Sequence, residues 1–168
     1  MHDHYFKQLN HDLKIAGTGL PQLIIDEKVL MQNIDFIKHS LKKASHLRPR
    51  FVVKSLGCMQ LIQLIAQQLE TQSFMVFHLP HIKQILDIFP QADLLLGKPM
   101  PATALRTFVA EKNEALIHQI QWLVDTVERA EQYLNIAQQF NLKLRLNIEI
   151  DVGLHRGGVE TMSQLDEI

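Results

Sequence analysis

Charged side chains stand directly after short apolar runs in this sequence, where the carboxyl ends of strands are expected. Lys54 follows Arg-Phe-Val-Val at 50–53. A lysine at the mouth of a mostly apolar sheet is desolvated, which favours the neutral amine over the ammonium. A neutral amine attacks carbonyls, so this position suits Schiff-base chemistry, for which pyridoxal 5'-phosphate (PLP) is the obvious carbonyl-bearing cofactor. The alternative is a lysine that simply extends into water.

A second candidate segment lies at 144–158. Along its first eight residues apolar and polar side chains alternate, so one strand face is apolar (Leu144, Leu146, Ile148, Ile150) and the other is polar (Arg145, Asn147, Glu149, Asp151). In a closed barrel the polar face points into the lumen, near a ligand; alternatively the segment is an edge strand with one wet face. Three glycines around Arg156 allow a tight loop that holds a guanidinium close to a ligand oxygen.

The elements that position these residues alternate between strand-like and helix-like patterns. Strand signals occur at 50–54, 74–77, 92–97, 121–124 and 142–151. Helical stripes follow Asp26, which can cap a helix start, and then occupy 61–69, 82–89 and the residues after Pro101. Asp125 and Glu128 have the spacing of a capping box, which predicts a last helix burying Val127, Ala130, Leu134 and Ala137. This alternation favours an α/β fold with about five parallel strands.

Composition narrows the functional classes. The 168 residues carry a net charge of −1 and 46% hydrophobic residues, which is typical of one soluble domain and gives no footprint for nucleic acid or a membrane surface. The single cysteine, Cys58, excludes an internal disulfide and favours a reducing, cytoplasmic location. Gly17-Thr18-Gly19 and Gly97-Lys98 do not complete a nucleotide-binding fingerprint.

Two segments taken together resemble a known family. RPRFVVKS at 48–55 and EIDVGLHRGGV at 149–159 resemble the fold-type III PLP enzymes, the family of alanine racemase N-terminal domains. Within it, the chain looks most like the branch that includes D-threonine aldolase and D-serine dehydratase, whose opening strand and helix are similar to PQLIIDEKVLMQNI at 21–34. The resemblance implies a polar tail at 1–20 and, at 21–168, the first part of a (β/α)₈ barrel.

The resemblance also implies roles for individual residues. Lys54 matches the lysine that forms the internal aldimine and then acts as acid/base at the substrate's α-carbon, and Arg156 matches the arginine that hydrogen-bonds the cofactor's phenolic oxygen. His78, Asn147 and His155 are further candidates for binding the cofactor, and no metal ligand is assigned. The implied protein is a PLP-dependent aldolase or racemase for a small D-amino acid, working as a homodimer. The alternative is a non-catalytic PLP-binding or assembly protein.

The sequence also departs from that family. The branch's aldolases continue the lysine motif as R-P-H-x-K-T-H-K, whereas Arg50 and Leu56-Gly57 stand here. A complete barrel needs roughly 250 residues, so these 168 should form an open half-barrel that self-associates and binds PLP weakly.

Several other residues have ordinary explanations. His78 and His81 have the i, i+3 spacing of a metal pair, yet we expect them at a helix start. We expect His2, His4 and His11 in a mobile terminus, Cys58 as a buried apolar filler, and Trp122 in the core.

Overall fold

The computed structural model describes residues 2–17, 19–111 and 114–168, without the side chain of His2. The chain divides into two compact units, Met1–Phe36 and Ile37–Ile168. Thr18, part of the glycine pair discussed above, lies outside the described residues. The predicted domain boundary between residues 20 and 21 stays a prediction.

The first unit contains helix α1 (His2–Ala16), which the sequence analysis did not predict, and the beginning of α2 (Glu27–Lys43). As predicted, Asp26 caps α2: its carboxylate accepts a 3.0 Å hydrogen bond from the backbone N–H of Val29. The strand implied within 21–25 is wrong. No described strand pairs with this segment, and Leu23 is fully exposed. The segment therefore has neither the inter-strand hydrogen bonds nor the side-chain burial that stabilise a strand.

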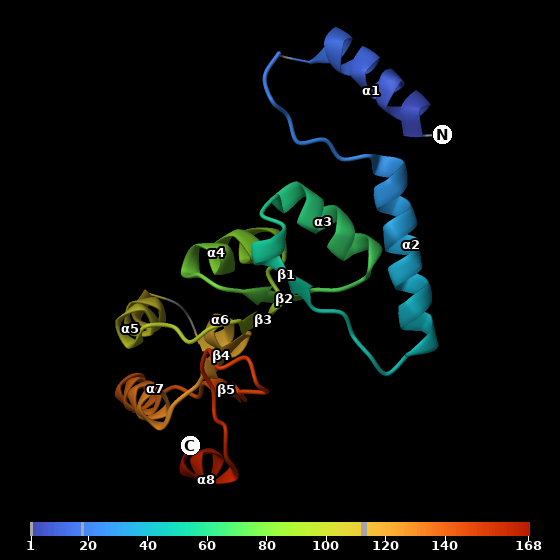
Figure 1. Ribbon diagram of the computed structural model, residues 1–168. Helices are drawn as coiled ribbons and strands as arrows, with labels where there is room; N and C mark the ends of the chain where they lie inside the picture. Colours follow the sequence, from blue (N-terminus) through green and yellow to red (C-terminus); the bar gives the residue numbers. More distant parts are fainter. Residues whose placement is uncertain (1, 18, 112–113) are drawn as a thin grey trace. The chain divides into compact units, whose positions relative to one another are not determined.

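The second unit contains one parallel sheet. Its strands are β1 (Phe51–Val52), β2 (Ser73–Val76), β3 (Asp93–Leu96), β4 (Ile120–Val124) and β5 (Arg145–Ile148), in the order β1-β2-β3-β4-β5 (Figure 1). All four strand pairs are parallel, so the predicted α/β fold with five parallel strands is confirmed. The connections carry α3 (Met59–Gln68), α4 (Leu79–Ile88), α5 (Ala102–Glu111), α6 (Glu114–His118) and α7 (Val127–Phe140); α8 (Met162–Glu167) follows β5.

Helices α3, α4, α5 and α7 lie along one side of the sheet, and the core fills the space between them (Figure 1). Alternate strand residues, such as Phe74, Leu94 and Trp122, are fully buried there. Trp122 confirms its predicted core position, with its ring edge-to-face against Phe108 and Tyr133. No helix in the described residues has the length and apolar character needed to cross a bilayer.

Three details of the sequence analysis are wrong. Thr126, not Asp125, is the N-cap of α7, and its hydroxyl accepts a 3.1 Å hydrogen bond from the backbone N–H of Arg129. In α7, Leu134 lies outward with 56% exposed, whereas Tyr133 and Ile136 are the buried residues. Cys58 is also exposed, since it precedes α3 as its N-cap rather than lying on the buried face of that helix.

Candidate active site at the carboxyl edge of the sheet

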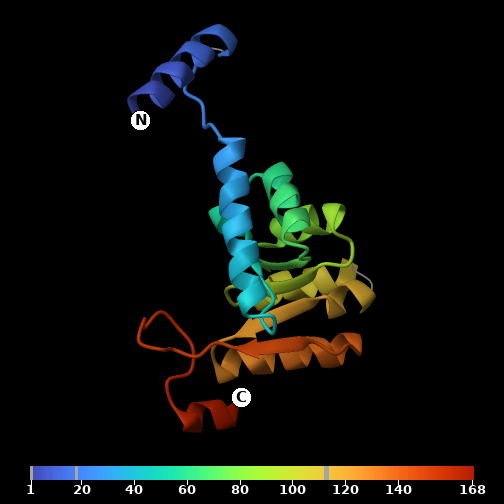
Figure 2. The same ribbon diagram turned by 90° about the vertical axis from the view of Figure 1, so that its right-hand side faces the viewer.

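The carboxyl ends of all five strands lie on one edge of the sheet because every pair is parallel. The chain beyond β5 forms a loop past this edge (Figure 2). A polar residue follows each strand at this edge: Lys54 after β1, His78 after β2, Lys98 after β3, Asp125 after β4 and Asp151 after β5. Parallel α/β proteins place their chemistry at this edge.

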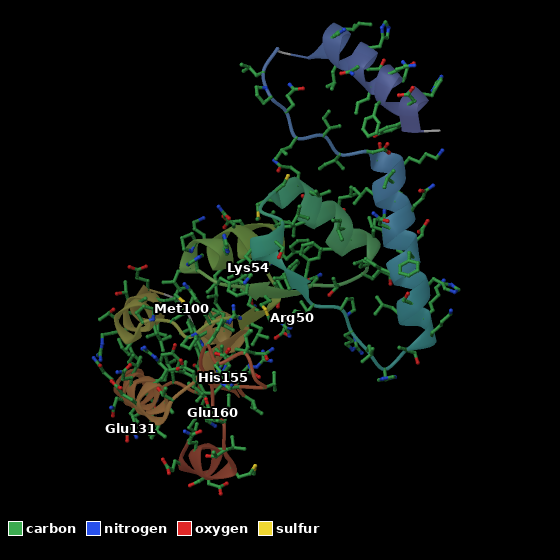
Figure 3. All side chains as sticks on the ribbon, viewed as in Figure 1. Arg50, Lys54, Met100, Glu131, His155 and Glu160 are labelled. Carbon is green, nitrogen blue, oxygen red and sulfur yellow. The ribbon has the colours of Figure 1, made fainter. Side chains whose placement is uncertain are left out.

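Lys54 lies in a 3₁₀ turn (Val53–Ser55) directly after β1 (Figure 3). Fully buried Val53 anchors the turn, and the backbone N–H of Leu56 donates a 3.1 Å hydrogen bond to the Val53 carbonyl. The Nζ atom of Lys54 is 4.3 Å from the centroid of the Phe77 ring. Lys54 itself is exposed, so the expected desolvation is not provided by the described residues.

The loop after β5 is organised by Asp151, whose side chain is only 3% exposed. Its Oδ1 accepts hydrogen bonds from the backbone N–H groups of Gly153, Leu154 and His155, at 2.8, 2.9 and 3.0 Å. These bonds, that from His155 foremost, lower the pKa of Asp151 because they favour its charged form. The polar strand face predicted at 144–151 includes Asp151, but this turn was not predicted; an aspartate two residues before a glycine is the signal for it.

Glycine allows this loop to close tightly against the sheet. At Gly158, φ is +100°, and an added Cβ would lie 2.8 Å from the Glu149 carbonyl oxygen. The backbone N–H of Val159 donates to that same oxygen at 2.9 Å. At Gly157, an added Cβ would lie 3.7 Å from Oδ2 of Asp125, so the loop passes beside the end of β4. Arg156 is therefore held, exposed, at the carboxyl edge.

His155 stands in this loop with a left-handed backbone (φ +52°) and an exposed side chain (Figure 3). Its Nδ1 lies 3.2 Å from Oδ2 of Asp151 and 3.7 Å from Oε1 of Glu160. One potential metal-ligand atom from each of these three residues lies within 4.8 Å of the others, a cluster that the sequence analysis did not identify. When protonated, the imidazole pairs with both carboxylates.

Lys54 and Arg156 share the carboxyl edge but follow the two outermost strands of the sheet. Four inter-strand steps of about 4.8 Å separate those strands, about 19 Å measured along the sheet. The two side chains are therefore not neighbours within the sheet. A ligand that contacts both side chains must lie beyond the ends of the strands between them.

Asn147 belongs to a polar network on the face of the sheet that points away from the core. Its amide donates to Gln121 at 2.9 Å, and Gln121 donates to Asp93 at 2.8 Å. Arg145 donates to the same carboxylate at 2.9 Å, and Arg50 forms an ion pair with it. Partial burial raises the pKa of Asp93, but the hydrogen bonds from Arg50, Gln121 and Arg145 outweigh it, so the pKa lies below its usual value.

His78 occupies the N-cap position of α4, as expected for a helix start, but its side chain makes no capping hydrogen bond. Its ring stands edge-to-face with that of His81, with centroids 5.5 Å apart. Nδ1 of His81 is buried and has no hydrogen-bond partner among the described residues. The structure therefore places His78 at the carboxyl edge, next to a second imidazole.

Comparison with known proteins agrees with this arrangement. The family model for the alanine racemase N-terminal domain matches residues 25–168. The chain belongs to this family. Its members use PLP, and the match includes both Lys54 and the loop that carries Arg156. No curated protein matches the chain.

Two solved structures share the fold. A histidine racemase from Leuconostoc mesenteroides subsp. sake superposes with a TM-score of 0.60 at 16% identity over 79% of this chain. A biosynthetic alanine racemase from Pseudomonas aeruginosa gives 0.55 at 17% identity over 80%. The chain spans 36% of the length of each racemase. The open sheet of five parallel strands with flanking helices is thus part of a TIM-type barrel, as predicted.

The chemistry of two residues at the carboxyl edge suits two groups of a PLP molecule. The exposed primary amine of Lys54 can reach an aldehyde, and the exposed guanidinium of Arg156 is a permanently charged donor for a phenolic oxygen. Buried Val53 fixes the turn that carries Lys54, and the glycines at 157 and 158 fix the loop that carries Arg156. The described edge thus offers groups for two of the cofactor's functional atoms.

Proposed function

We propose that this chain is the lysine-bearing part of a PLP-dependent enzyme that acts at the α-carbon of a small amino acid. The supporting observation is that Lys54 ends the first strand of a family-matched sheet, at the same edge as the loop carrying Arg156. In this proposal, Nζ of Lys54 binds the cofactor covalently and afterwards moves a proton at the α-carbon.

Other residues of the chain orient the ligand in this proposal. Arg156 donates a hydrogen bond to the phenolic oxygen and, being permanently charged, keeps that oxygen ionised. Asp151 holds the loop that presents Arg156 through its three backbone hydrogen bonds. His78, Asn147 and His155 line the approach from β2 and β5. When bound, PLP supplies an electron sink for the bond broken at the α-carbon.

We further propose a D-configured substrate and a reaction of the aldolase or racemase type, in a cytoplasmic homodimer. Support comes from the D-V-G-x-x-R-x-G segment at 151–158 together with the lysine segment at 48–55. The departures at Arg50 and Leu56-Gly57 are departures from the aldolase lysine motif and weigh against the aldolase reaction specifically. The single exposed cysteine suits a reducing compartment.

A non-catalytic PLP-binding protein is the second candidate, and one observation favours it. Nδ1 of His155, in the loop after β5, lies 3.2 Å from Asp151 and 3.7 Å from Glu160, so this imidazole is engaged within its own loop. A carrier needs Lys54 but no opposing acid or base. Exchange of the α-proton of D-amino acids in deuterated water, followed by NMR on the full-length protein, separates the two: an enzyme exchanges it and a carrier does not.

The attachment site is tested by incubating the 168-residue chain with PLP, reducing with borohydride and locating the label by peptide mass spectrometry. We expect partial labelling, concentrated on Lys54, because these residues supply only part of a binding site. Lys54→Ala should remove that label. Lys98→Ala is the matched control, since Lys98 also follows a strand at this edge and is exposed. Equal labelling of Lys54 and Lys98 would contradict the proposal.

A further inference from the structure

The ends of three neighbouring strands are joined by a stack of an ammonium, an aromatic ring and a glycine. The ammonium belongs to Lys54 after β1, the ring to Phe77 after β2, and the glycine is Gly97 after β3. Lys54 Nζ lies 4.3 Å from the centroid of the Phe77 ring. The family resemblance assigned no role to Phe77.

Gly97 makes room for the ring. A Cβ placed on Gly97 would lie 2.4 Å from both Cε1 and Cζ of Phe77, and 3.1 Å from Cγ of Met75. Real Cβ atoms do not approach other heavy atoms to 2.4 Å, so any larger residue at position 97 displaces the ring. The backbone N–H of Gly97 donates a 2.8 Å hydrogen bond to the Val76 carbonyl, which holds the glycine against the end of β2.

The ring in turn holds the ammonium. The face of an aromatic ring carries negative charge and attracts a cation within about 6 Å of its centroid. At an exposed site such as Lys54, this attraction favours the contact by about two- to fivefold over a freely solvated side chain. A lysine has four rotatable side-chain bonds, so without such a contact Nζ is spread over a wide volume of solvent.

We propose that Phe77, seated on Gly97, is a positioning residue for Lys54: it holds Nζ over the ends of β2 and β3, where a ligand in the barrel mouth would meet it. The importance of this position for chemistry rests on the proposed function. The contact itself does not, because it involves only residues of this chain.

The contact is tested by NMR without any cofactor. Reductive methylation with ¹³C-formaldehyde converts lysines to dimethyl-lysines, which keep their positive charge, and Lys54→Arg identifies the signal of Lys54. Methyl groups above a ring face are shifted upfield by the ring current. We expect the Lys54 signal upfield of the other lysines, with Lys98 unshifted as an internal control.

Three variants separate positioning from general effects on folding. Phe77→Leu should move the Lys54 signal to the position of the solvated lysines, and Phe77→Tyr, which keeps an aromatic face, should retain the upfield shift. Gly97→Ala should reduce the shift without altering either partner. A Lys54 signal among those of the solvated lysines in the native chain overturns the inference without any variant, as does an upfield signal that Phe77→Leu leaves in place.

The outcome is independent of the PLP-labelling experiment. An upfield shift without labelling of Lys54 would refute the proposed function and leave the lysine–ring contact standing. Labelling of Lys54 without the upfield shift would refute the lysine–ring contact and leave the proposed function standing.

Discussion

Asp93 is the residue that balances charge on the polar face of the sheet. Two guanidinium groups, from Arg50 and Arg145, converge on its carboxylate, and Gln121 donates to it as well. Arg50 also donates to the backbone carbonyls of Phe74 and Asp93, at 3.1 and 3.0 Å. The Asp93 carboxylate thus connects β3 to β4, to β5 and to Arg50 just before β1, and Arg50 adds a bond to β2.

We predict that Asp93→Asn destabilises the chain by about 1–2 kcal/mol near neutral pH, because charge-assisted hydrogen bonds are lost and the two guanidiniums are left without their counter-charge. The side chain is 34% exposed, and solvent screening keeps the effect below that of a buried pair. Urea unfolding followed by circular dichroism measures it. Asp87→Asn, in an exposed pair with Lys83, is the control and should change stability little.

The difference in stability between the native chain and Asp93→Asn should depend on pH. The folded-state pKa of Asp93 is lowered, so its stabilising contribution is fully present above the unfolded-state pKa of about 3.9 and is lost as pH falls through the folded-state value. The difference in unfolding free energy between native chain and Asp93→Asn should therefore narrow below about pH 4. A constant difference from about pH 7 to about pH 3 would show that the charge of Asp93 is not responsible.

Single residues were predictable where their position follows from chain order alone. Lys54 lies after β1 at the carboxyl edge because strand ends in parallel sheets share an edge, and this needs only the alternation of elements. The choice between a desolvated and an exposed amine could not be made from the sequence, since desolvation depends on what surrounds the amine in space. Arg50 and Asp93 are 43 residues apart, and nothing local to either residue indicates their ion pair.

At the scale of elements, the start of α7 shows how a local pattern misleads by one position. Asp125 and Glu128 have capping-box spacing, but Thr126 is also a strong N-cap residue, and its hydroxyl accepts from Arg129 three residues later. The chain leaves β4 at Val124, so Asp125 remains at the strand end beside Gly157 and the helix begins one residue later. The buried face was predicted wrongly for a separate reason: which side of α7 meets the sheet depends on how the helix packs, and the structure buries Tyr133 and Ile136.

We predict that Thr126→Ala lowers the free energy of unfolding by about 1 kcal/mol because one helix N–H loses its partner. Asp125→Ala is the comparison variant; it should leave helix stability nearly unchanged, since the Asp125 carboxylate does not cap α7. Urea unfolding of the two variants side by side makes the measurement. A larger loss for Asp125→Ala would restore the capping box expected from the sequence.

At the scale of the whole sheet, all five strands were predictable because each carries its own run of apolar residues. What covers each strand was not, because that depends on distant segments. The predicted apolar face of β5 exists, yet Leu146 is 45% exposed and Ile150 is 60% exposed. The polar face of β5 bonds to residues on β4 and β3, so the partners expected for that face are present. The burial expected for the apolar face is not.

This exposed face leads to a prediction about association. Among the described residues β5 pairs only with β4, and its free edge stands next to exposed Leu146 and Ile148. Unpaired apolar edges associate. In analytical ultracentrifugation we therefore expect the 19.4 kDa chain to form larger species as its concentration rises.

Ile148→Lys should raise the dissociation constant by about tenfold or more, because a charged edge residue opposes pairing and the apolar contact is lost. Leu134→Lys, at an exposed position on α7, is the control and should leave association unchanged. A monomeric native chain at all concentrations, or equal effects of the two lysines, would show that the edge of β5 does not drive association.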